Sequence, residues 1–207
     1  MGRFVSVCLA VLLAVVALDA QGIAGWKVRV DRSTSASDPD AAGEIKFMAM
    51  GAGFHAINPQ AAVFWKPGAN ASGTYALKGS FTLLKPSDHT NYYGLVFGGS
   101  DLDGPQQTYL YFMVAQDGTF LIKRRNGDAT VDVKGEEASP AVRKPGPNGQ
   151  STNDLEVRVG PDIIAYSVNG TTVHTTPRTG LTAKPDGAYG FRINHRLEVQ
   201  VENLGVS

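Results

Sequence analysis

Short apolar runs alternate with turn residues over most of the chain. From Thr74 to Val206, hydrophobic and polar positions exchange every second residue, which is the period of a strand with one buried face. No long stretch after residue 20 shows the three- and four-residue apolar spacing of a helix. Gly, Asn, Asp and Pro fill the gaps, as turns require. The pattern predicts these strands: Trp26–Val30, Ile45–Met50, Gly53–Ile57, Ala62–Trp65, Tyr75–Leu84, Tyr92–Phe97, Thr108–Ala115, Thr119–Arg125, Thr130–Val133, Leu155–Val159, Ile163–Val168, Thr171–His174, Ala188–Ile193 and Leu197–Val201.

Two hairpins can be predicted in register. Asp117-Gly118 and Asn169-Gly170 are dipeptides that accept the positive φ angles of a two-residue turn. The second turn joins Ile163–Val168 to Thr171–His174. A two-residue turn at the first would pair four residues with four others, namely Val114 with Leu121, Met113 with Ile122, Phe112 with Lys123 and Tyr111 with Arg124.

Two stretches lack strand character, and neither has the properties of an interdomain linker. Ser33–Ala42 is small and polar, which is typical of a surface loop, and Ser139–Thr152 is rich in Pro and Gly. Neither side of these stretches holds enough strands to close a separate core. We therefore predict one domain over residues 21–207, and a two-sheet antiparallel jelly-roll sandwich as its all-β fold.

The first twenty residues have the features of an export signal. Arg3 precedes an apolar run from Phe4 to Leu18, and Ala20 is a small residue at the expected cleavage point. Cleavage would begin the mature chain near Gln21, with Gly25 as the second choice. The sequence after it offers no stop-transfer flank, so we expect no membrane span in the mature chain and a periplasmic or extracellular location.

Charge and cysteine content exclude several functions. The sequence has 19 basic and 19 acidic residues, and this balance argues against nucleic acid or an anionic membrane as the main partner. Its single cysteine, Cys8, lies within the predicted signal. The mature chain therefore has no thiol for a disulfide, a nucleophile or a thiolate metal site.

Several segments between Gly53 and Val206 carry a family resemblance: Tyr92–Gly99, Tyr109–Phe112, Asp117–Arg125, Asn153–Val157, Val168–Gly170 and Gly190–Ile193. The chain resembles concanavalin-type jelly rolls. Within that group it is most similar to the extracellular bacterial domains named for 3-keto-disaccharide hydrolase, which are relatives of laminin G-like modules. The resemblance implies acidic and polar residues on a concave sheet, often near a metal, with an aromatic-Glu-x-Gln motif in a central strand. The comparable strand here, Thr108–Val114, has no carboxylate.

Candidate saccharide-binding residues lie on two segments. In the predicted register Arg124 stands beside Tyr111 and shares a face with Tyr109; aromatic rings stack on sugars, and guanidinium groups donate to hydroxyls or carboxylates. The alternative is that these tyrosines are core, together with Phe120 and Ile122, and that Arg124 lies at the rim. The second segment, near a strand end, supplies Arg192, Asn194 and His195.

Candidate metal ligands are sparse. Asp101 and Asp103 lie in a turn whose oxygens would suit calcium, a hard cation, although no cofactor is required by the sequence. The four histidines, His55, His89, His174 and His195, show no spacing typical of zinc sites. Three acidic pairs fall in predicted loops, where we interpret them as solvated: Asp38/Asp40, Asp101/Asp103 and Glu136/Glu137.

Three functions are compatible with these observations. The first is a non-catalytic module that binds a saccharide or cell-surface glycan. The second, implied by the resemblance, is a hydrolase or lyase acting on 3-keto-glycosides. The third is a structural or adhesive domain with a protein partner. Because no base has a metal-ligand companion at recognisable spacing, we expect turnover of a 3-keto-disaccharide to be absent or very slow. Oligomeric state stays open.

Overall fold

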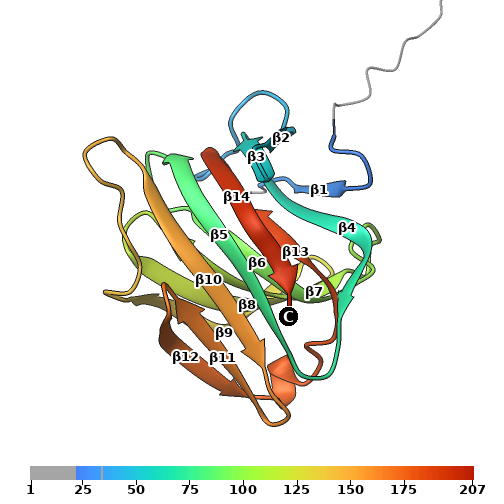
Figure 1. Ribbon diagram of the computed structural model, residues 1–207. Coiled ribbons are helices and arrows are strands. Elements are labelled where there is room, and N and C mark those ends of the chain that lie inside the picture. Colours follow the sequence, from blue (N-terminus) through green and yellow to red (C-terminus); the bar gives the residue numbers. More distant parts are fainter. Residues whose placement is uncertain (1–21, 34) are drawn as a thin grey trace, which may run out of the picture.

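The computed structural model describes residues 22–33 and 35–207, so the predicted signal at residues 1–20 lies outside the described part (Figure 1). Within the described ranges the regular elements are fourteen strands and one 3₁₀ turn, Gly180–Thr182. Every strand pairing is antiparallel, and the strands form two sheets of seven. The predicted all-β sandwich is confirmed. Among these residues, no helix has the length and apolar character that crossing a membrane requires.

Each sheet combines strands from distant parts of the sequence. Sheet A has the order β1 (Lys27–Asp31), β4 (Ala61–Ala71), β13 (Gly187–Ile193), β6 (Tyr92–Ser100), β7 (Thr108–Ala115), β8 (Thr119–Asn126) and β9 (Ala129–Ala138). Sheet B has the order β12 (Thr171–Pro177), β11 (Ile163–Val168), β10 (Ser151–Val159), β5 (Tyr75–Lys85), β14 (Leu197–Val206), β3 (Gly53–Asn58) and β2 (Lys46–Met50). All predicted strands are present, and β4, β9, β10 and β14 run several residues further than predicted. Ser151 and Thr152, expected in an irregular stretch, therefore belong to β10, and the Glu136/Glu137 pair, expected in a loop, lies in β9.

Sheet A buries apolar side chains on both of its faces. Alternate residues of β7, including Phe112, join residues of sheet B such as Phe81 in the core between the sheets. The intervening residues of β7, such as Tyr111, belong to a second buried cluster on the face that points away from sheet B. This second face, which we call the outer face of sheet A, carries Val63, Trp65, Tyr92, Val96, Tyr109, Tyr111, Met113 and Leu121.

The two predicted turns have different outcomes. Val168 stands opposite Thr171, and Asn169 and Gly170 have φ angles of 50° and 81°, which confirms the two-residue turn. The turn between β7 and β8 instead has three residues, with a left-handed conformation at Gly118, whose φ is 90°. The Asp117 carboxylate accepts a hydrogen bond from the Thr119 backbone N–H at 3.1 Å, which favours this longer turn.

The predicted β7–β8 register is therefore wrong by one residue. Each residue of β7 pairs one position earlier in β8, as follows: Val114 with Phe120, Met113 with Leu121, Phe112 with Ile122, and Tyr111 with Lys123. Because side chains alternate along a strand, a one-residue shift moves every side chain of β8 to the opposite face. Phe120 and Ile122 consequently lie in the core between the sheets, apart from Tyr109 and Tyr111.

Candidate functional site

A groove of about 550 Å³ lies along the outer face of sheet A near β1. Strands β1, β8 and β13 supply arginine side chains to it, and the loops after β1 and β13 close one end. We call it the arginine groove. Its lining includes Arg29, Asp31, Arg32, Ser33, Asp38, Asn91, Arg125, Asp128, Arg192, Asn194 and His195.

A nearly buried ion pair holds the middle of the groove. The side chains of Arg192 and Asp31 are 11% and 9% exposed, and Arg192 Nη1 donates to Asp31 Oδ2. Arg192 also donates to the Tyr109 hydroxyl at 3.1 Å, and that hydroxyl donates to Asp31 at 3.4 Å. The guanidinium carbon of Arg192 lies 5.7 Å from the centre of the Tyr111 ring, a cation–π distance. These contacts fix the guanidinium in one orientation.

The charges of this pair persist over a wide pH range. Burial by itself would raise the pKa of Asp31, but the neighbouring Arg192, Arg125 and Arg29 together hold that pKa below its ordinary value of 3.8. Burial raises the pKa of Tyr109 to about 12. At neutral pH the groove therefore contains a carboxylate and a neutral phenol beside the guanidinium.

Tyr109 and Tyr111 contact Arg192 but do not line the groove, so their rings are not available for stacking. Tyr109 and Tyr111 are 1% and 5% exposed, and they belong to the outer-face cluster, not to the core between the sheets. Their rings pack against each other with centroids 5.6 Å apart. The alternative that these tyrosines are core residues is confirmed by their burial, although Phe120 and Ile122 belong to the other cluster. Saccharide binding by the tyrosines stays a prediction.

Arg124 does not lie beside Tyr111, as the predicted register had placed it. In the observed register it pairs with Leu110 and Val131, and its Nη1 donates to the carbonyl of Leu181 at 3.0 Å. Its neighbour Arg125 takes the position opposite Tyr109 and lines the groove, where its Nε donates to the Gly127 carbonyl at 2.6 Å. The cause is the three-residue turn, which turns Arg125 instead of Arg124 toward the outer face of sheet A and puts Lys123 opposite Tyr111.

Arg192, Asn194 and His195 come together in the groove. The Asn194 backbone N–H donates to the Tyr92 carbonyl at 2.9 Å, and this bond anchors the turn that follows β13. Its side-chain Oδ1 is buried and has no hydrogen-bond partner among the described residues. His195 is nearly buried, with 7% of its side chain exposed.

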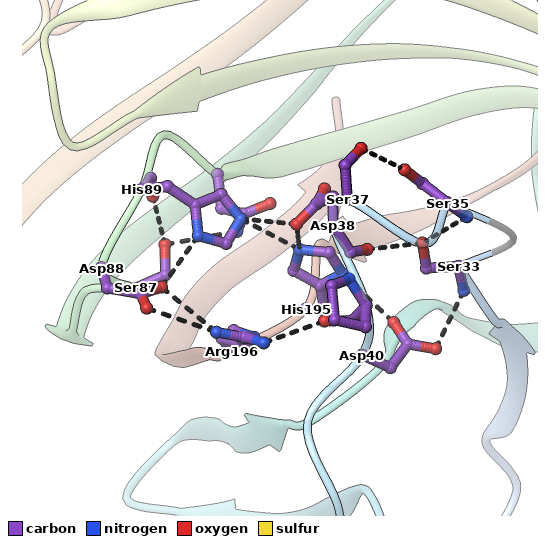
Figure 2. Close-up of polar contacts among 12 residues, drawn as sticks. Ser33, Ser35, Ser37, Asp38, Asp40, Ser87, Asp88, His89, His195 and Arg196 are labelled. Carbon is purple, nitrogen blue, oxygen red and sulfur yellow. Dashed lines mark hydrogen bonds and ion pairs between the residues drawn. The ribbon is translucent and has the colours of Figure 1, made fainter.

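Three polar loops meet at the end of the groove (Figure 2). His195 lies beside His89, which is 106 residues away in the sequence, and both approach Asp38. Asp40 contacts the other nitrogen of His195. The interpretation of Asp38 and Asp40 as solvated loop acids is therefore wrong, and sequence spacing held no signal for this cluster.

The proposed calcium ligands have other contacts. The Asp103 carboxylate pairs with Lys27, and Asp101 Oδ2 accepts a hydrogen bond from the Gln106 backbone N–H at 3.0 Å. Calcium binding by these two residues stays a prediction.

The solved structures similar to this chain are β-sandwiches. A carbohydrate-binding module, CBM66 from Bacillus subtilis, has a TM-score of 0.64 at 12% identity, over 88% of this chain and 95% of that one. A Bacillus subtilis protein of unknown function with a galectin-like fold has a TM-score of 0.56 at 15% identity, over 87% and 88% of the chains. A GH16 protein from the mixed-linkage glucan PUL of Bacteroides ovatus has a TM-score of 0.57 at 8% identity, over 85% and 92%.

These likenesses identify the fold as the jelly roll shared by carbohydrate-binding and carbohydrate-active proteins. No protein-family model matches the sequence, and no curated protein matches it either. The narrower resemblance to the 3-keto-disaccharide hydrolase type stays a prediction.

Proposed function

We propose that the protein is an exported, non-catalytic jelly-roll module that binds a saccharide in the arginine groove. The observation that carries this proposal is the open polar groove, in which other arginines surround the fixed and nearly buried guanidinium of Arg192. A side chain that is already immobilised loses little conformational entropy when a ligand binds to it. The jelly-roll likeness to a carbohydrate-binding module supports the same class of ligand.

The balance of charge in the groove favours an acidic saccharide. Four arginines and three aspartates line it, and Asp31 already pairs with Arg192. Guanidinium groups bind carboxylates with two parallel hydrogen bonds, which adds geometric selectivity. The buried, unpartnered Oδ1 of Asn194 can accept a hydrogen bond from a water that bridges it to a bound sugar. Recognition would thus rest on charged and polar groups, because the tyrosine rings are covered.

A matched pair of variants tests the site. Arg125→Ala removes a groove side chain, whereas Arg124→Ala removes an identical one from the opposite face of the same strand. Calorimetric titration with oligouronates should show binding at least about tenfold weaker for Arg125→Ala, since a hydrogen bond to a charged group contributes ~1.5–3 kcal/mol. Arg124→Ala should bind as the wild type does, and a neutral oligosaccharide should bind more weakly than a uronate. Equal losses in both variants would place the binding site elsewhere.

One observation favours the enzyme alternative, a 3-keto-glycoside hydrolase or lyase. His195 lines the groove and its Nδ1 is 3.1 Å from the Asp40 carboxylate, which is an arrangement that can orient an imidazole base. We still expect turnover of a 3-keto-disaccharide to be absent or very slow. Robust turnover that His195→Ala abolishes would make the enzyme the better description. If no saccharide binds and no turnover occurs, the adhesive alternative replaces both.

A further inference from the structure

The end of the arginine groove is built by three loops that lie far apart in the sequence. Asp38 and Asp40 come from the loop between β1 and β2, and His89 comes from the connection between β5 and β6. His195 comes from the turn between β13 and β14. Figure 2 shows the two imidazole rings in contact with each other and the Asp38 carboxylate beside them, joined to both rings.

Three potential ligand atoms converge on one point. The Nε2 atoms of His89 and His195 are 3.2 Å apart. Asp38 Oδ1 is 2.9 Å from the first nitrogen and 3.1 Å from the second. Four-coordinate zinc has metal–ligand distances of about 2.0–2.2 Å for nitrogen and oxygen, which places neighbouring ligand atoms roughly 3.3 Å apart. The three atoms are therefore already spaced as one face of such a coordination shell.

The outer nitrogen of each ring has a carboxylate partner. His195 Nδ1 is 3.1 Å from Asp40 Oδ1, and His89 Nδ1 is 2.8 Å from Asp88 Oδ1. A carboxylate accepts hydrogen bonds, so with a metal bound each Nδ1 would donate to its carboxylate and each Nε2 would present its lone pair inward. This carboxylate–imidazole arrangement is the one that orients histidine ligands in metal sites. Two lone pairs and a carboxylate oxygen that face one another would be stabilised by a cation between them.

The loops that carry these groups are tied to one another. The Ser33 backbone N–H donates to Asp40 Oδ2 at 2.9 Å, and the Ser33 hydroxyl donates to the Asp38 carbonyl at 2.7 Å. Arg196 donates to the Pro39 carbonyl at 3.1 Å and to Asp88 at 3.3 Å, which links all three loops (Figure 2). The cluster is thus held in place by contacts outside the ligand set.

We infer that His89 Nε2, His195 Nε2 and Asp38 bind one divalent transition-metal ion of the zinc type. Two imidazoles with one carboxylate favour such an ion over calcium or magnesium, which prefer oxygen ligands. The side chains of His89 and Asp38 are 38% and 48% exposed, so the ion can reach the site from solvent. The Asn91 amide nitrogen, 3.0 Å from His89 Nε2, would move away when the metal binds. Three protein ligands leave a coordination position for water or a groove ligand.

The test measures metal binding alone, so it is independent of the proposed saccharide binding. The purified protein is treated with EDTA, then titrated with Zn²⁺ by calorimetry and with Co²⁺ by visible absorption. We expect one ion per chain, with the absorption bands of nitrogen-ligated cobalt. His89→Ala and His195→Ala should each weaken binding by more than the ~10–100-fold expected for the outer-partner variant Asp40→Asn. The control His174→Ala removes a histidine outside the cluster and should bind as the wild type does.

A measurement on the wild-type protein covers the case in which a variant fails to fold. Nitrogen-15 NMR of the imidazoles should show the Nε2 signals of two histidines moving on addition of one equivalent of Zn²⁺, with both Nδ1 atoms protonated. Absence of stoichiometric binding, binding that survives both histidine substitutions, or Nε2 atoms that stay protonated with excess zinc would overturn the inference. The last outcome would mean that protons, and not a metal, fill the space between the rings.

Discussion

Replacing Asp31 with leucine perturbs the most deeply buried charge contact of the groove. In the wild type Arg192 is surrounded by Asp31, Tyr109 and Tyr111, and both members of the ion pair are about one-tenth exposed. Removing the carboxylate leaves a guanidinium buried in a place where water reaches it poorly. Burial opposes the charge of Arg192, and Tyr109 and Asp31 are among the neighbours that raise its pKa in the wild type. A guanidinium does not lose its proton in proteins, so the variant carries a charge without its buried carboxylate partner.

The expected magnitude follows from the burial of the pair. Breaking a buried ion pair by removing one partner costs about 3–5 kcal/mol of unfolding free energy, whereas losing an exposed pair costs about 0–1 kcal/mol. We expect Asp31→Leu to fall in the first range. The double variant Asp31→Leu/Arg192→Met should recover most of the loss, because the only charge among the described residues that it leaves without Asp31 is that of Arg29, which is 23% exposed and therefore partly hydrated.

Urea unfolding followed by circular dichroism measures these free energies. The wild type, Asp31→Leu, Arg192→Met and the double variant form a double-mutant cycle. The pH dependence adds a second test. Because the folded-state pKa of Asp31 lies below 3.8, the pair stabilises the fold fully above that pH and the stability is lost as pH falls through the folded-state pKa. The double variant should lack this part of the acid sensitivity. A single-variant loss under 1 kcal/mol, or strict additivity in the cycle, would refute the reasoning.

Three further predictions concern the turn chemistry, the tyrosines and export. Gly170→Ala should lower the free energy of unfolding by about 1–2 kcal/mol, because Gly170 has a left-handed backbone conformation although the space around it is free. Gly205 also has free space but no positive φ, so Gly205→Ala should change stability by less than about 0.5 kcal/mol in the same urea assay. Burial raises the pKa of six of the seven tyrosines, namely Tyr75, Tyr92, Tyr93, Tyr109, Tyr111 and Tyr166. Ultraviolet absorbance should therefore show far fewer than seven ionised tyrosines near pH 10, and the free energy of unfolding should fall as pH rises above that value. Exported protein should have the intact mass of a chain that begins near Gln21, and a mass that includes residues 1–20 would contradict signal cleavage.

The strands could be predicted because their signal is local. Period-two alternation and Gly-containing turns appear within eight or ten residues, and tertiary contacts change only the strand ends, as in β4 and β14. Tyr109 and Tyr111 were harder to place because sheet A is buried on both faces, so apolar character alone does not say which face a residue occupies.

The spacing of residues in the sequence could not predict the β7–β8 register or the histidine cluster. An Asp-Gly pair is compatible with both two- and three-residue turns, and the contact of Asp117 with Thr119 favours the longer one. The longer turn shifts the register, so that Arg125 and not Arg124 lines the groove. His89 and His195 meet only because β6 and β13 are neighbours in sheet A, a pairing across about half the chain. A search for paired histidine spacing cannot find ligands that the topology assembles.

The central claim is that the arginine groove binds the saccharide. Titrating nitrogen-15-labelled protein with an acidic oligosaccharide and following the side-chain N–H signals of arginine and asparagine tests it most directly. We expect the side-chain N–H signals of Arg125, Arg192 and Asn194 to shift together as ligand is added and to fit a single binding constant. Shifts confined to the shallow pocket on sheet B, around Lys78 and Asp154, would contradict it.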